Sequence, residues 1–163
     1  MTNFVYILLG GNLGDREENM TVARSYIEEQ VGKIIKVSSI YETASWGIAG
    51  QPDFLNQVVL ILTNFSAEKV METILAIENK MGRIRTEKNA SRIIDIDILF
   101  FNDEVINEPG LTVPHPQIQN RKFVLEPLDE IASDLIHPIF KQSIKNLLST
   151  SKDKLKVKPL SKL

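Results

Sequence analysis

The chain has 163 residues, of which 43% are hydrophobic and 25% charged, and these values predict one globular domain with a sizeable core. It contains no cysteine, which excludes a disulfide framework, a thiolate-bound zinc site and a cysteine nucleophile. The net charge of -2 argues against a nucleic-acid-binding protein, because that class usually carries a positive net charge. No signal-peptide pattern and no membrane-length apolar run are present, so we expect a cytoplasmic protein without membrane or nucleic-acid partners.

Strand and helix patterns alternate through the first hundred residues. In chain order they predict a strand over 4–9, a helix capped by Asp15 and ended by Gly32, a β-branched strand over 34–41, a strand over 54–62, a helix capped by Ser66 and ended by Gly82, and an apolar strand over 93–101. The segments 42–52 and 83–92 between them are expected to be loops. This βαββαβ order is typical of an α+β fold with a ferredoxin-like antiparallel sheet and both helices on one face.

The remaining third of the chain predicts C-terminal additions to this unit. A turn at Asn102 leads into a short partner strand near residues 105–106, and three prolines keep the next stretch extended. A helix within 123–132 follows, with Pro127 limiting its start, and a last short helix covers 142–148. We expect a single domain over residues 1–163, with the Lys-rich segment 151–163 forming a loose tail or edge strand.

Two aspartates lie two residues apart within the apolar run 93–101. Because side chains alternate across a strand, Asp95 and Asp97 share one face, with Cα atoms roughly 6.5–7 Å apart. The other face, which ends at Phe100, must be core. Two ionised carboxylates this close repel, so a shared proton, nearby cations or a divalent metal must offset their charge. With only two histidines in the chain, oxygen ligands favour Mg²⁺. The plainer alternative is a chance pair on a solvated face, which so apolar a strand disfavours.

Three of the six arginines lie just before this aspartate pair. Arg83, Arg85 and Arg92 belong to the charged segment 83–92. A guanidinium group is always charged and presents a donor fork that suits phosphate oxygens. Arginines next to a carboxylate pair therefore predict a site for a Mg-bound polyphosphate. The alternative is a solvated loop whose arginines pair with Glu87 or with the aspartates.

Two other motifs carry weaker signals. The glycine-rich segment 10–15 follows a strand and opens a helix, but it matches neither the dinucleotide nor the Walker pattern, so we interpret it as a tight turn. His115 has a proline on each side, which suits a positioned phosphate ligand, although an ordinary loop histidine fits equally well. His137 has no companion motif and is interpreted as structural. By composition alone, Phe54 and Phe123 are more typical of core positions.

Together these motifs resemble the hydroxymethyl-dihydropterin pyrophosphokinase family over residues 4 to about 139. The matching segments are 9–15 (LGGNLGD), 41–43 (YET), 51–56 (QPDFLN), Glu78 with 82–85 (GRIR), Arg92 with 95–99 (DIDIL), 113–116 (VPHP) and 121–125 (RKFVL). Each segment is a weak signal, but their order and spacing together are highly specific.

The resemblance implies an ATP-dependent enzyme of folate biosynthesis that transfers pyrophosphate to the hydroxyl of 6-hydroxymethyl-7,8-dihydropterin and releases AMP, by in-line attack on the β-phosphorus. It implies that Asp95 and Asp97 bind two Mg²⁺ ions with ATP and are catalytic together with Arg83 and Arg92. The implied ATP contacts are Glu78, Arg83, Arg92, Ile98, Thr112, His115 and Arg121. The implied pterin contacts are Thr43, Ala44, Ser45, Trp46, Phe54, Asn56 and Phe123, with the two phenylalanines sandwiching the ring. A functional link to dihydropteroate synthase, the next enzyme of the pathway, is a further expectation.

Two other functions compete with this interpretation. A ferredoxin-like regulatory module that binds a small ligand without catalysis fits the fold, but leaves the aspartate pair and the arginine-rich segment unexplained. A two-metal nuclease would also use paired carboxylates, but should carry a basic surface, against which the net charge argues.

Overall fold

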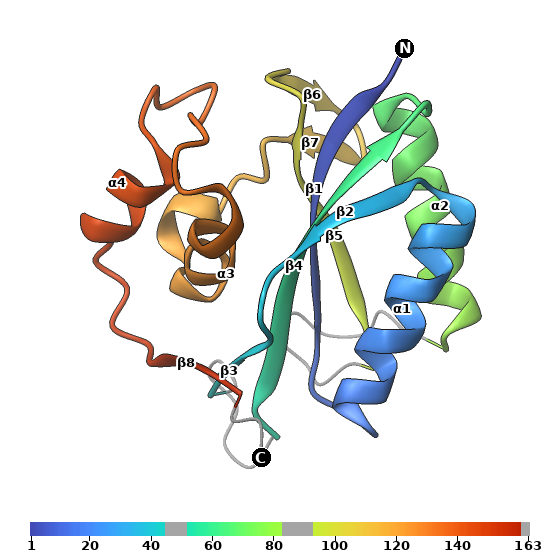
Figure 1. Ribbon diagram of the computed structural model, residues 1–163, viewed down its shortest axis with the longest axis horizontal. Helices are drawn as coiled ribbons and strands as arrows, with labels where there is room; N and C mark the ends of the chain where they lie inside the picture. Colours follow the sequence, from blue (N-terminus) through green and yellow to red (C-terminus); the bar gives the residue numbers. More distant parts are fainter. Residues whose placement is uncertain (45–51, 83–92, 161–163) are drawn as a thin grey trace.

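The computed structural model describes residues 1–44, 52–82 and 93–160. A twisted antiparallel sheet runs through the molecule, with helices on both faces (Figure 1). Its strands are β1 (Asn3–Gly11), β2 (Lys33–Val37), β3 (Tyr41–Thr43), β4 (Phe54–Thr63), β5 (Asp95–Phe101) and β8 (Val157–Pro159). The strand order is β5-β1-β4-β3-β8, and β2 also pairs with β4, beside β3. The α+β class and the antiparallel sheet are as predicted.

Helices α1 (Arg16–Gln30) and α2 (Ala67–Lys80) cover one face of the sheet, as the βαββαβ order predicts (Figure 1). Both begin at their predicted caps, where the side chains of Asp15 and Ser66 each accept a backbone N–H bond at 3.1 Å. Gly32 follows α1 where a Cβ would collide with the Leu62 carbonyl. The positive φ of Gly82, +87°, suits the end of α2. Local signals therefore placed both helices.

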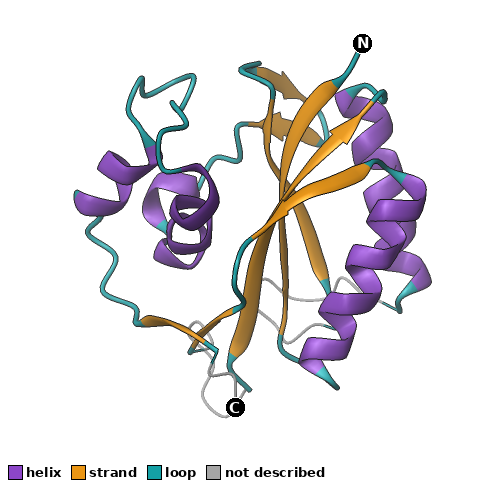
Figure 2. Cartoon of the chain, in the orientation of Figure 1, coloured by secondary structure: helices purple, strands orange, loops and turns teal. Residues whose placement is uncertain are grey.

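Helices α3 (Lys122–Ala132) and α4 (Ile144–Ser149) lie on the opposite side of the sheet, as Figure 2 shows. One hydrophobic core lies between the sheet and helices α1 and α2. A second core fills the space between the sheet and helices α3 and α4, with Val58, Leu99 and Leu125 among its buried members. A 3₁₀ turn over Ile118–Asn120 leads into α3, while β6 (Ile106–Glu108) and β7 (Leu111–Val113) form a separate two-stranded sheet. None of the helices in the described part of the chain is long and apolar enough to cross a membrane.

The predicted strand over 34–41 is two strands, because Ser38 interrupts it. The Ser38 backbone N–H donates to the Val58 carbonyl, but the Val58 N–H donates to the Ser38 hydroxyl, at 3.0 Å, instead of to a carbonyl. The Gln57 side-chain Nε2 donates to the Ser38 carbonyl at 2.7 Å. The Ser38 hydroxyl thus replaces one backbone acceptor in the pairing with β4, and β2 ends at Val37.

Three further expectations are corrected. Phe100 belongs to the α3-side core, not to the face of Ile96 and Ile98, because the β1–β5 register skips Leu99 and this bulge reverses the alternation. The short strand after Asn102 pairs with β7 and not with β5. Helix α3 begins before Pro127 and continues through it, although the ring removes one N–H donor and crowds the carbonyl four residues earlier.

His137 is buried against Phe100 in the second core, which agrees with its interpretation as structural. Its Nδ1 accepts the backbone N–H groups of Ile139, at 3.2 Å, and Phe140, at 3.3 Å. Burial lowers the pKa of His137. Protonation of Nδ1 would break both hydrogen bonds and charge a buried ring.

We expect the stability of the fold to fall at acidic pH. A histidine whose pKa is lowered by folding stabilises the protein above its unfolded pKa of about 6.5, and this stabilisation is lost as the pH falls through the folded pKa. Urea unfolding at about pH 7.5 and about pH 5.5 should show a smaller difference in His137→Asn than in the wild type, since Asn Oδ1 can accept the same bonds without titrating. Equal pH differences in both proteins would contradict this role.

Candidate active site

A cavity of about 460 Å³ opens on the α3 side of the sheet, between the strands and the N-terminal end of α3. Nine of its lining residues are sequence-predicted site residues: Thr43, Ala44, Phe54, Asn56, Asp95, Asp97, His115, Arg121 and Phe123. Six more were not predicted: Leu8, Gly10, Leu99, Gln117, Asn120 and Val124. Segments that are far apart in the sequence therefore meet around one volume.

Asp95 and Asp97 project into this cavity from the start of β5. Asp95 pairs with Gly10 of β1 and Asp97 with Leu8, so both residues lie in the ordered part of the sheet. Ile96, between them, is buried on the opposite face, in the core under α1 and α2. The strand alternation that the sequence predicts thus puts the two carboxylates on the same wall, where each is half-buried.

Gly10 provides space beside these aspartates. It pairs with Asn56 of β4, and a Cβ on Gly10 would lie 2.7 Å from Asn56 Oδ1. Interpreting segment 10–15 as a turn suits Gly14, which has a φ of +70°. Gly10 and Gly11, however, belong to β1, and Gly10 lets the buried Asn56 amide occupy the cavity wall.

An aromatic pair lines the same cavity from two sides. Phe54 begins β4, and Phe123 lies in the first turn of α3. Thr43 and Asn56, both buried, add polar groups to the sheet wall. Apolar faces with a few hydrogen-bonding groups at the edge suit a planar heterocycle of low charge.

His115 and Arg121 form a cationic and hydrogen-bonding wall. The His115 backbone N–H donates to the Leu99 carbonyl at 3.0 Å, which ties this loop to β5. His115 Nδ1 accepts the Gln117 N–H at 3.1 Å, so a neutral ring carries its proton on Nε2. Burial, and next the Arg121 charge, lower the pKa of His115, against an opposing effect of Asp95. The neutral ring can therefore donate an Nε2–H bond to an anion that the Arg121 charge attracts.

Helix α3, which carries Phe123, is held against β3 by Glu130. The Glu130 carboxylate accepts the Ser39 backbone N–H at 3.0 Å and the Tyr41 hydroxyl at 2.7 Å. Burial, and next the Glu130 hydrogen bond and charge, raise the pKa of Tyr41, so the hydroxyl remains a donor. No local pattern in the sequence indicates this contact, because its partners are about 90 residues apart.

Three implied ATP contacts lie away from the cavity walls. Glu78 of α2 is buried on the other side of β5, where its Oε2 accepts the Ile96 N–H at 2.7 Å. Ile98 is in the core under α1 and α2, and Thr112 is exposed on β7. Four more predicted residues, Ser45, Trp46, Arg83 and Arg92, lie outside the described residues.

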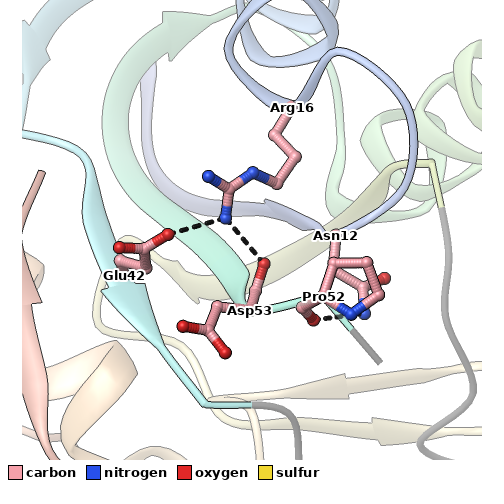
Figure 3. Close-up of polar contacts among 5 residues, drawn as sticks. All are labelled: Asn12, Arg16, Glu42, Pro52 and Asp53. Atoms are coloured by element: carbon pink, nitrogen blue, oxygen red, sulfur yellow. Dashed lines mark hydrogen bonds and ion pairs between the residues drawn. The ribbon is translucent and has the colours of Figure 1, made fainter. Parts of the chain in front are cut away.

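Two residues near the start of α1, Asn12 and Arg16, bind the chain just before β4 (Figure 3). Asn12, which is buried, donates from Nδ2 to the Pro52 carbonyl at 2.9 Å. Arg16 Nη1 donates to Glu42 Oε2 at 2.7 Å and to the Asp53 carbonyl at 2.9 Å. Neither residue was predicted from the sequence to have a role in the site. The glycine-rich segment therefore supports the cavity as well as forming a turn.

Comparisons with known proteins agree on one family. Residues 6–133 match the sequence model described as 7,8-dihydro-6-hydroxymethylpterin-pyrophosphokinase (HPPK). The chain is 40% identical over 141 residues to a 2-amino-4-hydroxy-6-hydroxymethyldihydropteridine pyrophosphokinase of Aquifex aeolicus, covering 86% of this chain and 88% of that protein. It is 42% identical over 136 residues to the protein of the same name from Bacillus subtilis, covering 83% and 81%.

The fold also matches a solved structure of a longer protein. The crystal structure of Plasmodium falciparum HPPK-DHPS with pteroate matches with a TM-score of 0.74 and 20% identity, over 91% of this chain and 42% of the Plasmodium chain. At that identity the match supports the fold. Together with the match over residues 6–133 and the two bacterial relatives, it shows that this chain belongs to the 7,8-dihydro-6-hydroxymethylpterin-pyrophosphokinase family, the ATP-dependent pyrophosphokinases of folate biosynthesis.

Proposed function

We propose that the cavity catalyses transfer of the terminal pyrophosphoryl group of ATP to the hydroxyl of 6-hydroxymethyl-7,8-dihydropterin. The hydroxyl oxygen forms a bond to the β-phosphorus, the bond from that phosphorus to the oxygen bridging the α-phosphate breaks, and AMP leaves while the hydroxyl loses its proton. One observation carries the proposal: the aspartate pair and the aromatic pair line the same cavity. A phosphate end and a heterocycle end are thus held within reach of each other.

The pterin end would be formed by Phe54 of β4 and Phe123 of α3, which both line the cavity. Stacking on two aromatic faces orients a flat ring, and the buried Thr43 and Asn56 can hydrogen-bond its edge. Ala44 lines the same end, and Ser45 and Trp46 follow it in the sequence. The substrate's hydroxymethyl group would then face the aspartates.

The aspartate pair fits Mg²⁺ that arrives with the nucleotide. Among residues 1–44, 52–82 and 93–160, no group of three or more His, Asp or Glu side chains could hold a metal alone. Proteins commonly bind Mg²⁺ together with a polyphosphate through one or two carboxylates, and water and phosphate oxygens fill the other coordination positions. We propose that Asp95 and Asp97 bind two such ions. When bound, the ions neutralise phosphate charge and orient the reacting oxygens.

The remaining phosphate charge would be taken by donors around the pair. His115 can donate from Nε2, and Arg121 supplies a charged donor fork. We keep Arg83, Arg92, Ile98 and Thr112 as proposed nucleotide contacts from the family resemblance. Hydrogen-bond donors of this kind stabilise charge that develops on the phosphates. We propose that Glu78, which accepts the Ile96 N–H, also helps to hold the two aspartates in position, because Ile96 lies between them.

The proposal is tested by separating the nucleotide products after incubation with ATP, Mg²⁺ and 6-hydroxymethyl-7,8-dihydropterin. We expect AMP to form only when the pterin is present. Formation of ADP would contradict attack on the β-phosphorus. A folded protein that binds the pterin without turnover would favour the regulatory-module alternative.

The product of this reaction would carry a diphosphate leaving group on the pterin methylene, which suits it for a following substitution. The matching Plasmodium falciparum protein, HPPK-DHPS, is a longer chain, of which the match covers 42%. This supports the proposed functional link to dihydropteroate synthase. Because its substrates would be ATP and a biosynthetic intermediate, we propose that the enzyme acts in the cytoplasm.

A further inference from the structure

The geometry points to Arg16 as a positioning residue that holds the pterin end of the cavity in place; this inference rests on the proposed function. Arg16 is the first residue of α1 and does not line the cavity. Its guanidinium instead binds Glu42 of β3 and the carbonyl of Asp53, which immediately precedes β4 (Figure 3). Both strands line the cavity.

Arg16 contacts the immediate neighbours of two cavity residues. One Nη1 donates to Glu42 Oε2 at 2.7 Å and to the Asp53 carbonyl at 2.9 Å. Glu42 precedes Thr43 in β3, and Asp53 precedes Phe54 in β4. Thr43 and Phe54 are themselves opposite each other in the β3–β4 register. One side chain thus binds the residue that precedes each member of this cross-strand pair.

The contact comes from the face of the hairpin opposite to the cavity. Successive side chains of a strand point to opposite faces, so Glu42 points away from the cavity that Thr43 lines. The exposed side-chain fractions are 29% for Arg16 and 18% for Glu42, so the ion pair is only partly solvated. A charge-assisted bond at this distance and partial burial is stronger than an exposed surface pair.

The position of Arg16 is unfavourable for the helix alone. The first turn of a helix carries a partial positive charge and favours acidic residues, and Glu17 and Glu18 follow that preference. A cation at the first helical residue opposes it. Within the described residues, the interactions that compensate Arg16 are the hydrogen bonds to Glu42 and to the Asp53 carbonyl, so this side chain stabilises the start of β3 and β4 more than it stabilises α1.

The test is a comparison of steady-state kinetics and pterin binding in Arg16→Ala, Glu42→Ala and the double variant. We expect the KM for the pterin to rise about tenfold in Arg16→Ala, equivalent to the loss of one hydrogen bond to a charged group. The KM for ATP should change less than about twofold, because the phosphate end lies on β5 and α3. The double variant should be no worse than Arg16→Ala, because both substitutions remove the same contact.

Arg24→Ala is the matched control. Arg24 lies on the same helix and also donates to a β4 residue, Gln57 Oε1 at 2.6 Å, which does not line the cavity. We expect Arg24→Ala to lower the midpoint of unfolding without changing the KM for the pterin. Arg16→Lys, which keeps the charge, should restore part of the pterin affinity and remain available if Arg16→Ala does not fold.

Binding of fluorescent 6-hydroxymethylpterin, measured with Mg²⁺ and a non-hydrolysable ATP analogue, separates this inference from the proposed function. A wild-type protein that forms no AMP contradicts the proposed function. A wild type that turns over, with Arg16→Ala variants whose pterin KM and pterin binding are unchanged, contradicts the inference. Equal increases in the KM values for ATP and pterin would do the same.

Discussion

Asp97→Ala should abolish turnover while leaving the protein folded. We expect kcat to fall by at least about 10²–10³-fold, which is the usual cost of removing one group that stabilises transition-state charge. The fold should survive because Asp97 is half-buried at the cavity wall and belongs to neither hydrophobic core. The measurement is kcat together with thermal unfolding, for which we expect a single cooperative transition as in the wild type.

Asp103→Ala is the matched control for Asp97. Asp103 is exposed in the turn that follows β5, so its removal deletes a carboxylate from the same part of the chain without touching the cavity. We expect wild-type kcat in this variant. Wild-type activity in Asp97→Ala would disprove the proposed metal ligands.

Phe123→Ala should weaken pterin binding far more than ATP binding. Burying one phenylalanine ring against a ligand contributes about 1.5–3 kcal/mol, so we expect an increase of about 10–150-fold in the dissociation constant for the pterin. Arg121 lies over the Phe123 ring, with Cζ 5.6 Å from the ring centroid, so a small effect on ATP is expected as well. Fluorescence titration with 6-hydroxymethylpterin measures the first effect and ATP titration the second.

Two other variants distinguish stacking from packing at this position. Phe123→Leu keeps an apolar side chain against the second core but removes the aromatic face, so it should stay folded and still bind the pterin weakly. Phe4→Ala removes an exposed ring outside the cavity and should change neither affinity. A Phe123→Leu protein with wild-type pterin affinity would show that stacking does not hold the ligand.

Local signals in the sequence predicted most of the elements. Asp15 and Ser66 mark helix starts because a side-chain cap depends only on residues two or three positions away. The shared wall of Asp95 and Asp97 followed from strand periodicity, which holds wherever the strand is regular. The same rule placed Phe100 wrongly, since a bulge at Leu99 depends on the partner strand and not on β5 itself.

The support around the site could not be predicted, because it consists of long-range contacts. Glu130 reaches Tyr41, and Arg16 reaches Glu42, only after α3, α1 and β3 are assembled. Gly10 appeared to belong to a turn, and its function depends on the Asn56 amide of a strand more than 40 residues away. The roles proposed for Phe54 and Phe123 came from the family resemblance, since composition alone indicates a core position for each.

The most direct test of the proposed reaction follows each phosphorus of ATP into its product. Wild-type protein is incubated with Mg²⁺, 6-hydroxymethyl-7,8-dihydropterin and ATP labelled at the β- or the γ-phosphorus, and the pterin and nucleotide products are separated. We predict that both labels appear in the pterin product in equal amounts and that the nucleotide product is unlabelled AMP. Transfer of the γ-label alone, with the β-label remaining in ADP, would contradict the proposed function.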